Sequence, residues 1–157
     1  GEISDVVTET LYVDETGDIQ ICRGNAHQFG YRRSIFTDKD FIAASVFRLK
    51  KGNQEEIEQK MADYMNRRRE KQPLEYPSAG SVFKRPEGHF AGALIEECGL
   101  KGCRIGGAMV SEKHAGFIVN AGNATCRDVR ELIAKIQKTV KERFGVTLEP
   151  EIRFIDS

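Results

Sequence analysis

The sequence contains no tryptophan and only four cysteines in 157 residues, and none of the cysteines belongs to a Cys-x-x-Cys pair. Zinc sites are commonly built from such pairs, with histidines at matching intervals, and no such histidines lie nearby. The sparse thiols therefore argue against a metal site. We expect reduced structural thiols, which are typical of the cytoplasm, at Cys22, Cys98, Cys103 and Cys126.

The chain also lacks net charge and long apolar runs. Lys and Arg together number 24, as do Asp and Glu, so no overall field favours nucleic acid or a membrane surface. No apolar run approaches the roughly 20 residues of a membrane-spanning helix, and no signal-like segment is present. The basic run at residues 67–71 leaves RNA or another polyanion as an alternative partner, but the absence of Trp weighs against it.

A dinucleotide-binding motif is missing as well. No G-x-G-x-x-G follows an expected strand, and the glycines at Gly106, Gly107 and Gly122 have the wrong spacing. What remains is ordinary globular composition, with 39% hydrophobic and 31% charged residues. The length suits one or two small domains.

The first third of the chain predicts strands. Residues 6–13 and 19–22 flank a polar turn, and residues 41–49 form a third run, rich enough in apolar side chains to be buried. Lys50, Lys51 and Gly52 then interrupt the pattern, and we place a domain boundary between residues 50 and 51.

The remainder predicts a mixture of helices and strands. Asn53 can cap a helix that Pro73 ends, a short helix covers residues 90–98, and Thr125 can cap a long helix that Gly145 ends. Strands are expected at residues 104–111, 116–120 and 147–155. An antiparallel sheet covered by helices on one face gives an α+β fold.

The segment 76–86 (YPSAGSVFKRP) is the most suggestive for chemistry. Ala79 and Gly80 leave no bulk around the Ser81 hydroxyl, and Lys84 and Arg85 follow closely. This pattern suits a serine presented to an anionic ligand. A strand leaving a proline-bounded turn, in which Ser81 only satisfies backbone groups, would produce the same residues.

Two further segments accompany it: residues 29–36 (FGYRRSIF) and 148–155 (LEPEIRFI). The three together, in this order, resemble the UDP-N-acetylenolpyruvoylglucosamine reductase (MurB) family, bacterial flavoenzymes that make UDP-N-acetylmuramate for peptidoglycan. The similarity continues through residues 100–102, 105–108 and 116–120, and so covers nearly the whole chain.

The resemblance implies a reaction and assigns roles. NADPH reduces FAD, hydride passes to the methylene carbon of UDP-N-acetylglucosamine enolpyruvate, and the adjacent carbon must then be protonated. The family pattern makes Ser81 the proton donor and gives stabilisation of the developing charge to Arg32 and Glu151. A planar guanidinium can hold a carboxylate bidentately, which suits Arg32. Otherwise Arg32 is a surface loop residue and Glu151 a solvent-facing strand residue.

The resemblance also implies substrate contacts. Lys71 matches a lysine that contacts the UDP group, although a basic last turn is favoured by the helix dipole in any case. The other positions lining the substrate cleft are Tyr31, Arg85, His114 and Arg153. Arg85 stands where one branch of the family carries Asn, and His114 likewise replaces an amide.

The family pattern further implies that the chain is the C-terminal half of the enzyme. Residues 1–50 would be the tail of the FAD-binding domain and residues 51–157 the substrate-binding domain, in the second, insertion-free type of the family. The main flavin-holding region would be the missing N-terminal half, so we expect the chain alone not to retain FAD. A catalytically silent UDP-sugar-binding or regulatory module is the alternative.

Overall fold

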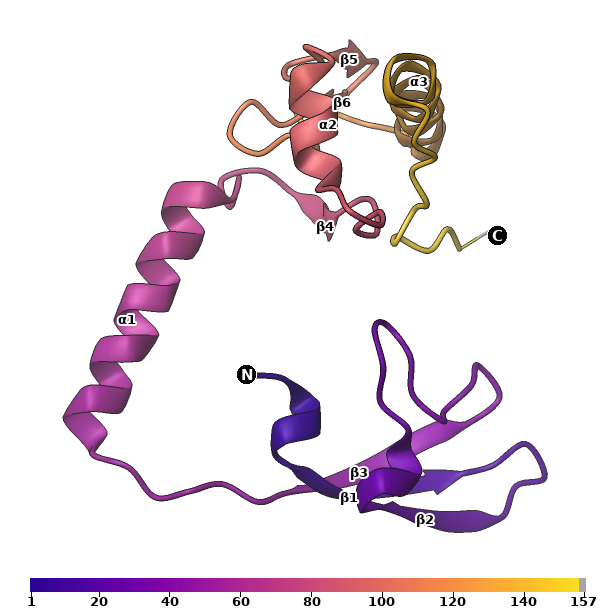
Figure 1. Ribbon diagram of the computed structural model, residues 1–157. Helices are drawn as coiled ribbons and strands as arrows, with labels where there is room; N and C mark the ends of the chain where they lie inside the picture. Colours follow the sequence, from indigo (N-terminus) through magenta and orange to yellow (C-terminus); the bar gives the residue numbers. More distant parts are fainter. Residues whose placement is uncertain (156–157) are drawn as a thin grey trace. The chain divides into compact units, whose positions relative to one another are not determined.

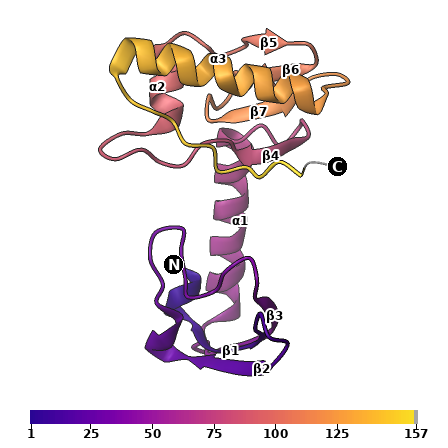
Figure 2. The ribbon, with the colours of Figure 1, turned by 90° about the vertical axis from the view of Figure 1, so that its right-hand side faces the viewer.

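The computed structural model describes residues 1–155 of the chain and divides into two compact units, Gly1–Glu56 and Ile57–Ser157. Figure 1 and Figure 2 show the elements of each unit along the sequence. Assignment of the first part to a flavin domain and of the second to substrate binding stays a prediction.

The first unit contains a three-stranded antiparallel sheet in the order β2-β1-β3 (Figure 1). Its strands are β1 (Val7–Val13), β2 (Ile19–Arg23) and β3 (Phe41–Phe47), accompanied by the short 3-10 helices η1 (Ile3–Asp5) and η2 (Gly24–His27). All three strands were predicted from their apolar runs and from the polar turn between the first two. In the β1–β2 turn, the Asp14 carboxylate accepts hydrogen bonds from the Thr16 hydroxyl and from backbone amides, and these hold its pKa below the ordinary value.

The prediction that residues 41–49 are buried is wrong, because every residue of β3 is exposed. The cross-strand pairs Leu11–Ile21, Val13–Ile19 and Val13–Phe41 share one face of the sheet. Within the first unit, no second layer covers the side chains on this face. An apolar strand is buried only where a layer packs on it, and the pattern of one strand cannot supply that layer.

Helix α1 (Gln54–Lys71) begins and ends where the sequence indicates. Asn53 caps it through its side-chain oxygen, which accepts a hydrogen bond from the Glu56 amide at 3.1 Å. The helix ends two residues before Pro73, as proline requires. Its apolar stripe remains exposed along its length, at Ile57, Met61, Tyr64 and Met65.

The second unit is an α+β arrangement, which confirms the predicted fold class. Its four-stranded sheet is antiparallel throughout, in the order β4-β7-β6-β5. The strands are β4 (Ser78–Ser81), β5 (Arg104–Ile105), β6 (Ala108–Val110) and β7 (Phe117–Asn120), and two helices, α2 (Ala91–Glu97) and α3 (Cys126–Phe144), accompany them (Figure 2).

Residues 104–111 form a hairpin instead of the single strand that was predicted. Gly106 has a φ of +54°, and the chain reverses between β5 and β6. A Cβ atom on Gly107 would lie 2.1 Å from the Gly122 carbonyl oxygen, so only glycine allows this close approach. The two adjacent glycines were the signal for a turn inside the apolar run.

The predicted strand over residues 147–155 is also wrong. Only an isolated bridge between Phe83 and Pro150 forms there, flanked by two backbone hydrogen bonds. Pro150 has no amide hydrogen, so a continuous ladder cannot pass through it.

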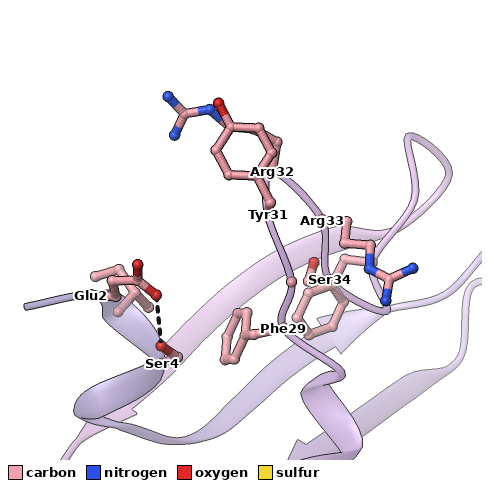
Figure 3. A pocket seen from close by; sticks show the side chains of 10 residues that line it. Glu2, Ser4, Phe29, Tyr31, Arg32, Arg33 and Ser34 are labelled. Carbon is pink, nitrogen blue, oxygen red and sulfur yellow. Dashed lines mark hydrogen bonds between the residues drawn. The ribbon is translucent and has the colours of Figure 1, made fainter. Parts of the chain in front are cut away.

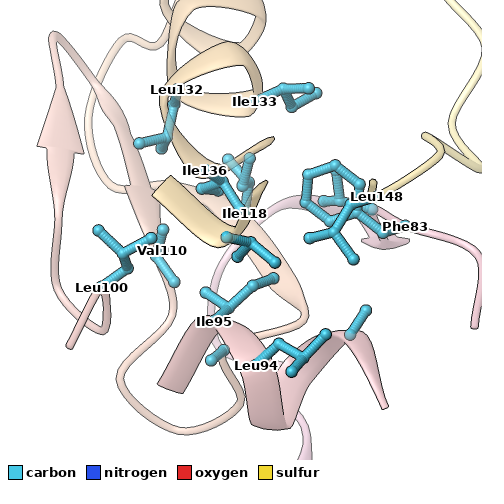
Figure 4. Packing of buried hydrophobic residues seen from close by; sticks show 14 of the residues in the cluster. Phe83, Leu94, Ile95, Leu100, Val110, Ile118, Leu132, Ile133, Ile136 and Leu148 are labelled. Atoms are coloured by element: carbon cyan, nitrogen blue, oxygen red, sulfur yellow. The ribbon is translucent and has the colours of Figure 1, made fainter. Parts of the chain in front are cut away.

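Helix α3 anchors the core of the second unit. Thr125 and Asp128 form a reciprocal capping box, and Gly145 ends the helix in the left-handed conformation. The Thr125 amide, followed by the Gly107 amide, stabilises the Asp128 carboxylate and lowers its pKa. The apolar face of α3 packs with α2 and the sheet through Leu132, Ile133, Ile136, Leu94, Ile95, Val110 and Ile118 (Figure 4).

Candidate functional site

Ser81 lies at the end of β4, where the strand passes from the surface into the core. Ser81 is exposed, whereas Val82 and Phe83, which follow it directly, are buried. Gly80 precedes it with a φ of +84°, a conformation that an L side chain rarely adopts, and no atom lies within 4 Å of where a Cβ would stand. The Ser81 hydroxyl makes no hydrogen bond within residues 1–155, so it is available to a ligand.

The backbone brings Glu151 against Val82, the residue that follows Ser81. The Glu151 amide donates to the Val82 carbonyl oxygen at 2.7 Å, and the Val82 amide donates to the Gly116 carbonyl oxygen at 2.9 Å. The segment after Ser81 is thus held between the start of β7 and the chain near residue 150. Two of the three predicted catalytic residues, Ser81 and Glu151, therefore share one edge of this unit.

Glu149, two positions before Glu151, is engaged in an ion pair. The Lys84 ammonium contacts the Glu149 carboxylate, and the Lys84 amide donates to the Glu149 carbonyl oxygen at 2.9 Å. The ion pair engages the Glu149 carboxylate, so Glu149 is a poor candidate for contact with a ligand.

His114 approaches the same edge through a turn that follows β6. Its Nδ1 accepts a hydrogen bond from the Gly116 amide at 3.0 Å, so the proton of the neutral ring is on Nε2. The ring meets the Phe117 ring edge-on, with centroids 5.0 Å apart, and Phe117 pairs with Ser81 in the sheet. The arrangement gives this edge an N–H donor.

The remaining predicted residues of the second unit are spread more widely. The Arg85 guanidinium lies 4.0 Å from the centre of the Phe90 ring. Lys71 is the last residue of α1 and is exposed, as is Arg153. These three cations offer positive charge to an anionic ligand.

Tyr31 and Arg32 belong to the first unit, at the end of the loop that follows η2. The Gly30 and Arg33 backbones close the loop with two hydrogen bonds of 3.0 and 3.2 Å. Arg32 has a φ of +55°, which is uncommon for a residue with a side chain. Its guanidinium carbon lies 5.4 Å from the centre of the Tyr31 ring.

This loop lines a concave pocket of 880 Å³ together with the start of the chain. Figure 3 shows Tyr31 and Arg32 at the end of the loop that is farthest from the strands, and Phe29 closer to the strands. Glu2 and Ser4 lie on the opposite side of the pocket. Guanidinium groups at a concave surface suit a carboxylate or phosphate. Each unit thus has its own group of candidate residues.

The described residues do not form a dinucleotide site of the common parallel-sheet type. Dinucleotide sites of the common type use parallel strands and a glycine-rich turn at a helix N-terminus. Both sheets here are antiparallel, and no such turn leads into α1, α2 or α3. The described residues also hold no group of three or more metal-ligating side chains, and none of their helices has the length and hydropathy to cross a bilayer.

One residue of the site region escaped sequence reasoning. His27 lies two positions before the 29–36 motif and is fully buried beneath it. A single histidine in the stretch Gly-Asn-Ala-His carries no recognisable motif, and only its burial and contacts draw attention to it. Its contacts are taken up below.

Comparison with known proteins gives one consistent result. Residues 72–155 match the family described as UDP-N-acetylenolpyruvoylglucosamine reductase, C-terminal domain. The chain is 54% identical to the UDP-N-acetylenolpyruvoylglucosamine reductase of Caldanaerobacter subterraneus subsp. tengcongensis over 98% of its own length and 51% of that relative's. The corresponding values for the reductase of Lachnoclostridium phytofermentans are 51%, 99% and 50%. The chain therefore spans about half the length of these relatives.

The fold has a solved counterpart. The crystal structure of the Thermus caldophilus UDP-N-acetylenolpyruvylglucosamine reductase (MurB) superposes with a TM-score of 0.83 at 37% identity, covering 98% of this chain and 54% of that one. The three motifs at residues 29–36, 76–86 and 148–155 had indicated the same relationship, which is now confirmed. The chain belongs to the UDP-N-acetylenolpyruvoylglucosamine reductase family, and residues 72–155 are its C-terminal domain.

Proposed function

We propose that this chain supplies the proton donor and substrate-binding groups of a reductase acting on UDP-N-acetylglucosamine enolpyruvate in peptidoglycan synthesis. The observation that carries the proposal is the exposed Ser81, which directly precedes the Val82 carbonyl that accepts from the Glu151 amide, within a domain of this family. The complete enzyme would use FAD and NADPH as its electron source. Free thiols at all four cysteines support a cytoplasmic setting.

Ser81 would complete the reduction of the enolpyruvyl double bond. That bond takes up one hydride at its methylene carbon, and the pair of electrons left on the adjacent carbon then takes a proton. A carbon-centred enolate is a strong base, so a hydroxyl held within hydrogen-bond distance can protonate it without a lowered pKa. The alkoxide left on Ser81 must recover a proton, and Glu151 or a water that it holds is suitably placed along the chain.

Arg32 and the other cations would hold the negative groups of the substrate. Arg32 can bind the enolpyruvyl carboxylate through two parallel hydrogen bonds, which strengthen as charge develops there. Lys71, Arg85, His114, Arg153 and Tyr31 would contact the UDP-sugar. The missing partner in this assignment is the N-terminal, FAD-binding half of the relatives.

Replacing Ser81 by Ala in the complete reductase tests the assignment. Reduction of the bound flavin by NADPH should survive, while its reoxidation by enolpyruvyl substrate should slow by about 10²- to 10⁴-fold, the usual contribution of general acid catalysis. Ser81→Cys is the matched variant, since it keeps a transferable proton and should recover part of the rate. Stopped-flow reoxidation of Ser81→Ala at the parental rate would give the role to Glu151 instead.

A catalytically silent UDP-sugar-binding module is the second candidate. The described residues form no dinucleotide site of their own, which favours this reading for the chain in isolation. Binding of a UDP-sugar without flavin-dependent turnover in the complete protein would establish it.

A further inference from the structure

His27 is the most enclosed polar residue of the first unit, with 1% of its surface exposed. Both of its ring nitrogens have partners. Nδ1 lies 2.8 Å from the Gly24 carbonyl oxygen, and Nε2 lies 2.9 Å from the Thr10 hydroxyl. Thr10 is itself only 3% exposed and lies on the central strand β1. His27 and Thr10 are thus two hydrogen-bonded polar side chains buried on a three-stranded sheet. Apolar side chains would fill the same space, so the polar pair points to a role other than packing.

The partners fix the direction of each hydrogen bond. A carbonyl oxygen can only accept, so His27 Nδ1 carries a proton and donates to Gly24. In the neutral ring, Nε2 then accepts from the Thr10 hydroxyl, whose oxygen lies 3.4 Å from the Ser45 hydroxyl on β3. Ser45 then donates to the Thr10 hydroxyl, Thr10 donates to His27 Nε2, and His27 Nδ1 donates to the Gly24 carbonyl oxygen. The chain of hydrogen bonds ties two strands to the segment that leads into the Arg32 loop.

The His27 ring also packs against both ends of that loop. Phe29 stacks on it with centroids 5.1 Å apart and an interplanar angle of 5°, and Phe36 meets it edge-on at 6.0 Å. The His27 carbonyl oxygen accepts a hydrogen bond from the Ile35 amide at 2.8 Å. The segment that enters the loop and the segment that leaves it are therefore fastened to one residue.

Such fastening matters because Arg32 occupies a left-handed conformation. A non-glycine residue in the left-handed conformation is sterically strained, and contacts with the surrounding structure must stabilise it. Besides the Gly30–Arg33 pair, His27 contacts both segments at the base of the loop, and Phe36 also packs edge-on against Tyr12 with ring centroids 5.1 Å apart. We propose that His27 is a positioning residue for Arg32, which sets the direction of the guanidinium toward the substrate carboxylate; the inference rests on the proposed function of Arg32.

The structural half of the proposal can be tested on the chain itself by amide hydrogen exchange. His27→Phe keeps an aromatic ring but removes both polar contacts, and exchange at Gly30, Arg33 and Ile35 should accelerate about tenfold or more, as expected when a local opening becomes easier. Cys22→Ala is the control, since it removes buried volume beside Thr10 without touching the loop. Unchanged loop exchange in His27→Phe would overturn the proposal.

A second variant covers the possibility that the unpaired Thr10 hydroxyl destabilises the whole sheet. His27→Phe combined with Thr10→Val removes both members of the polar pair, which is often far less disruptive than removing one. The sheet amides of β1 and β2 should then keep their protection while the loop amides lose theirs. Equal acceleration in sheet and loop would mean that His27 supports the sheet as a whole and does not position Arg32.

Turnover of the complete reductase tests the connection to Arg32. His27→Phe and Arg32→Lys should each lower kcat/KM by about 10²-fold, because a displacement of about 1 Å has that effect. If His27 acts through Arg32, the double variant should lose no more than about twofold beyond Arg32→Lys, since coupled residues are not additive. Losses that multiply would refute the positioning role. A fully active Arg32→Lys would instead refute the proposed function of Arg32.

Discussion

Gly107 shows how one missing side chain permits a turn. Its ideal Cβ would lie 2.1 Å from the Gly122 carbonyl oxygen and 2.4 Å from the Ala124 amide nitrogen, both of which are backbone atoms. Gly107→Ala must therefore displace the hairpin or the segment before α3. We expect a loss of about 1 to 3 kcal/mol in the free energy of unfolding, the usual range for overpacking.

Gly99→Ala provides the comparison for this prediction. A Cβ at Gly99 would meet no atom within 4 Å, and the substitution adds only the strain of a φ of +70°. That strain is about 1 to 2 kcal/mol. Urea unfolding of the two variants should show the larger loss for Gly107→Ala, and the reverse order would mean that the hairpin relaxes easily.

Lys71 is the residue through which the diphosphate assignment can be tested on this chain. Its loss should weaken binding of UDP-N-acetylglucosamine about tenfold, as expected for removal of one charge-assisted contact. Isothermal calorimetry of Lys71→Ala measures the effect. Arg68→Ala, on the same exposed helix end, should bind like the parent. Equal affinity in both variants would remove Lys71 from the site.

Helix α3 has the clearest prediction of pH dependence among the elements. The Thr125 and Gly107 amides lower the pKa of Asp128 in the folded chain, so the ionised carboxylate stabilises the fold above the ordinary pKa of Asp. That contribution is lost as the pH falls through the lowered value. Asp128→Asn should therefore melt below the parent at pH 7, and the difference should narrow toward pH 3 in thermal unfolding.

Elements with strong local signals were predictable from sequence, and those that depend on neighbours were not. Asn53, Thr125 and Gly145 mark helix ends by their own chemistry, and the structure places α1 and α3 accordingly. The exposure of β3 depends on which layers pack against it, and no residue within the strand encodes that. The failed strand near Pro150 shows the opposite case, since the proline itself should have ended the prediction.

The candidate site shows the same division. The 76–86 and 148–155 motifs indicated Ser81 and Glu151 through family resemblance, and a backbone hydrogen bond joins Glu151 to Val82, the residue after Ser81. The roles of all eight predicted site residues stay predictions. The supporting contacts of His27 and the Lys84–Glu149 ion pair join residues far apart in sequence, so no local pattern could have revealed them.

For the molecule as a whole, the main prediction concerns cofactor. The described residues form no dinucleotide site of the common parallel-sheet type, and the chain spans only about half the length of its relatives. We therefore expect the purified chain to be colourless, with no flavin absorbance near 450 nm, and not to consume NADPH. Absorbance spectra before and after incubation with FAD and desalting provide the measurement. A stoichiometric yellow preparation that oxidises NADPH would contradict the prediction.

The exposure of β3 affects the solubility of the purified chain. Its seven residues, FIAASVF, carry no charge and no proline, and β3 is an edge of the sheet among the described residues. Uncharged apolar edge strands recruit one another into intermolecular sheets. With a sequence pI near 7.0, electrostatic repulsion between molecules is weakest at neutral pH. Concentrated solutions should therefore become turbid fastest near pH 7. They should stay soluble longest in mildly alkaline, low-salt buffer.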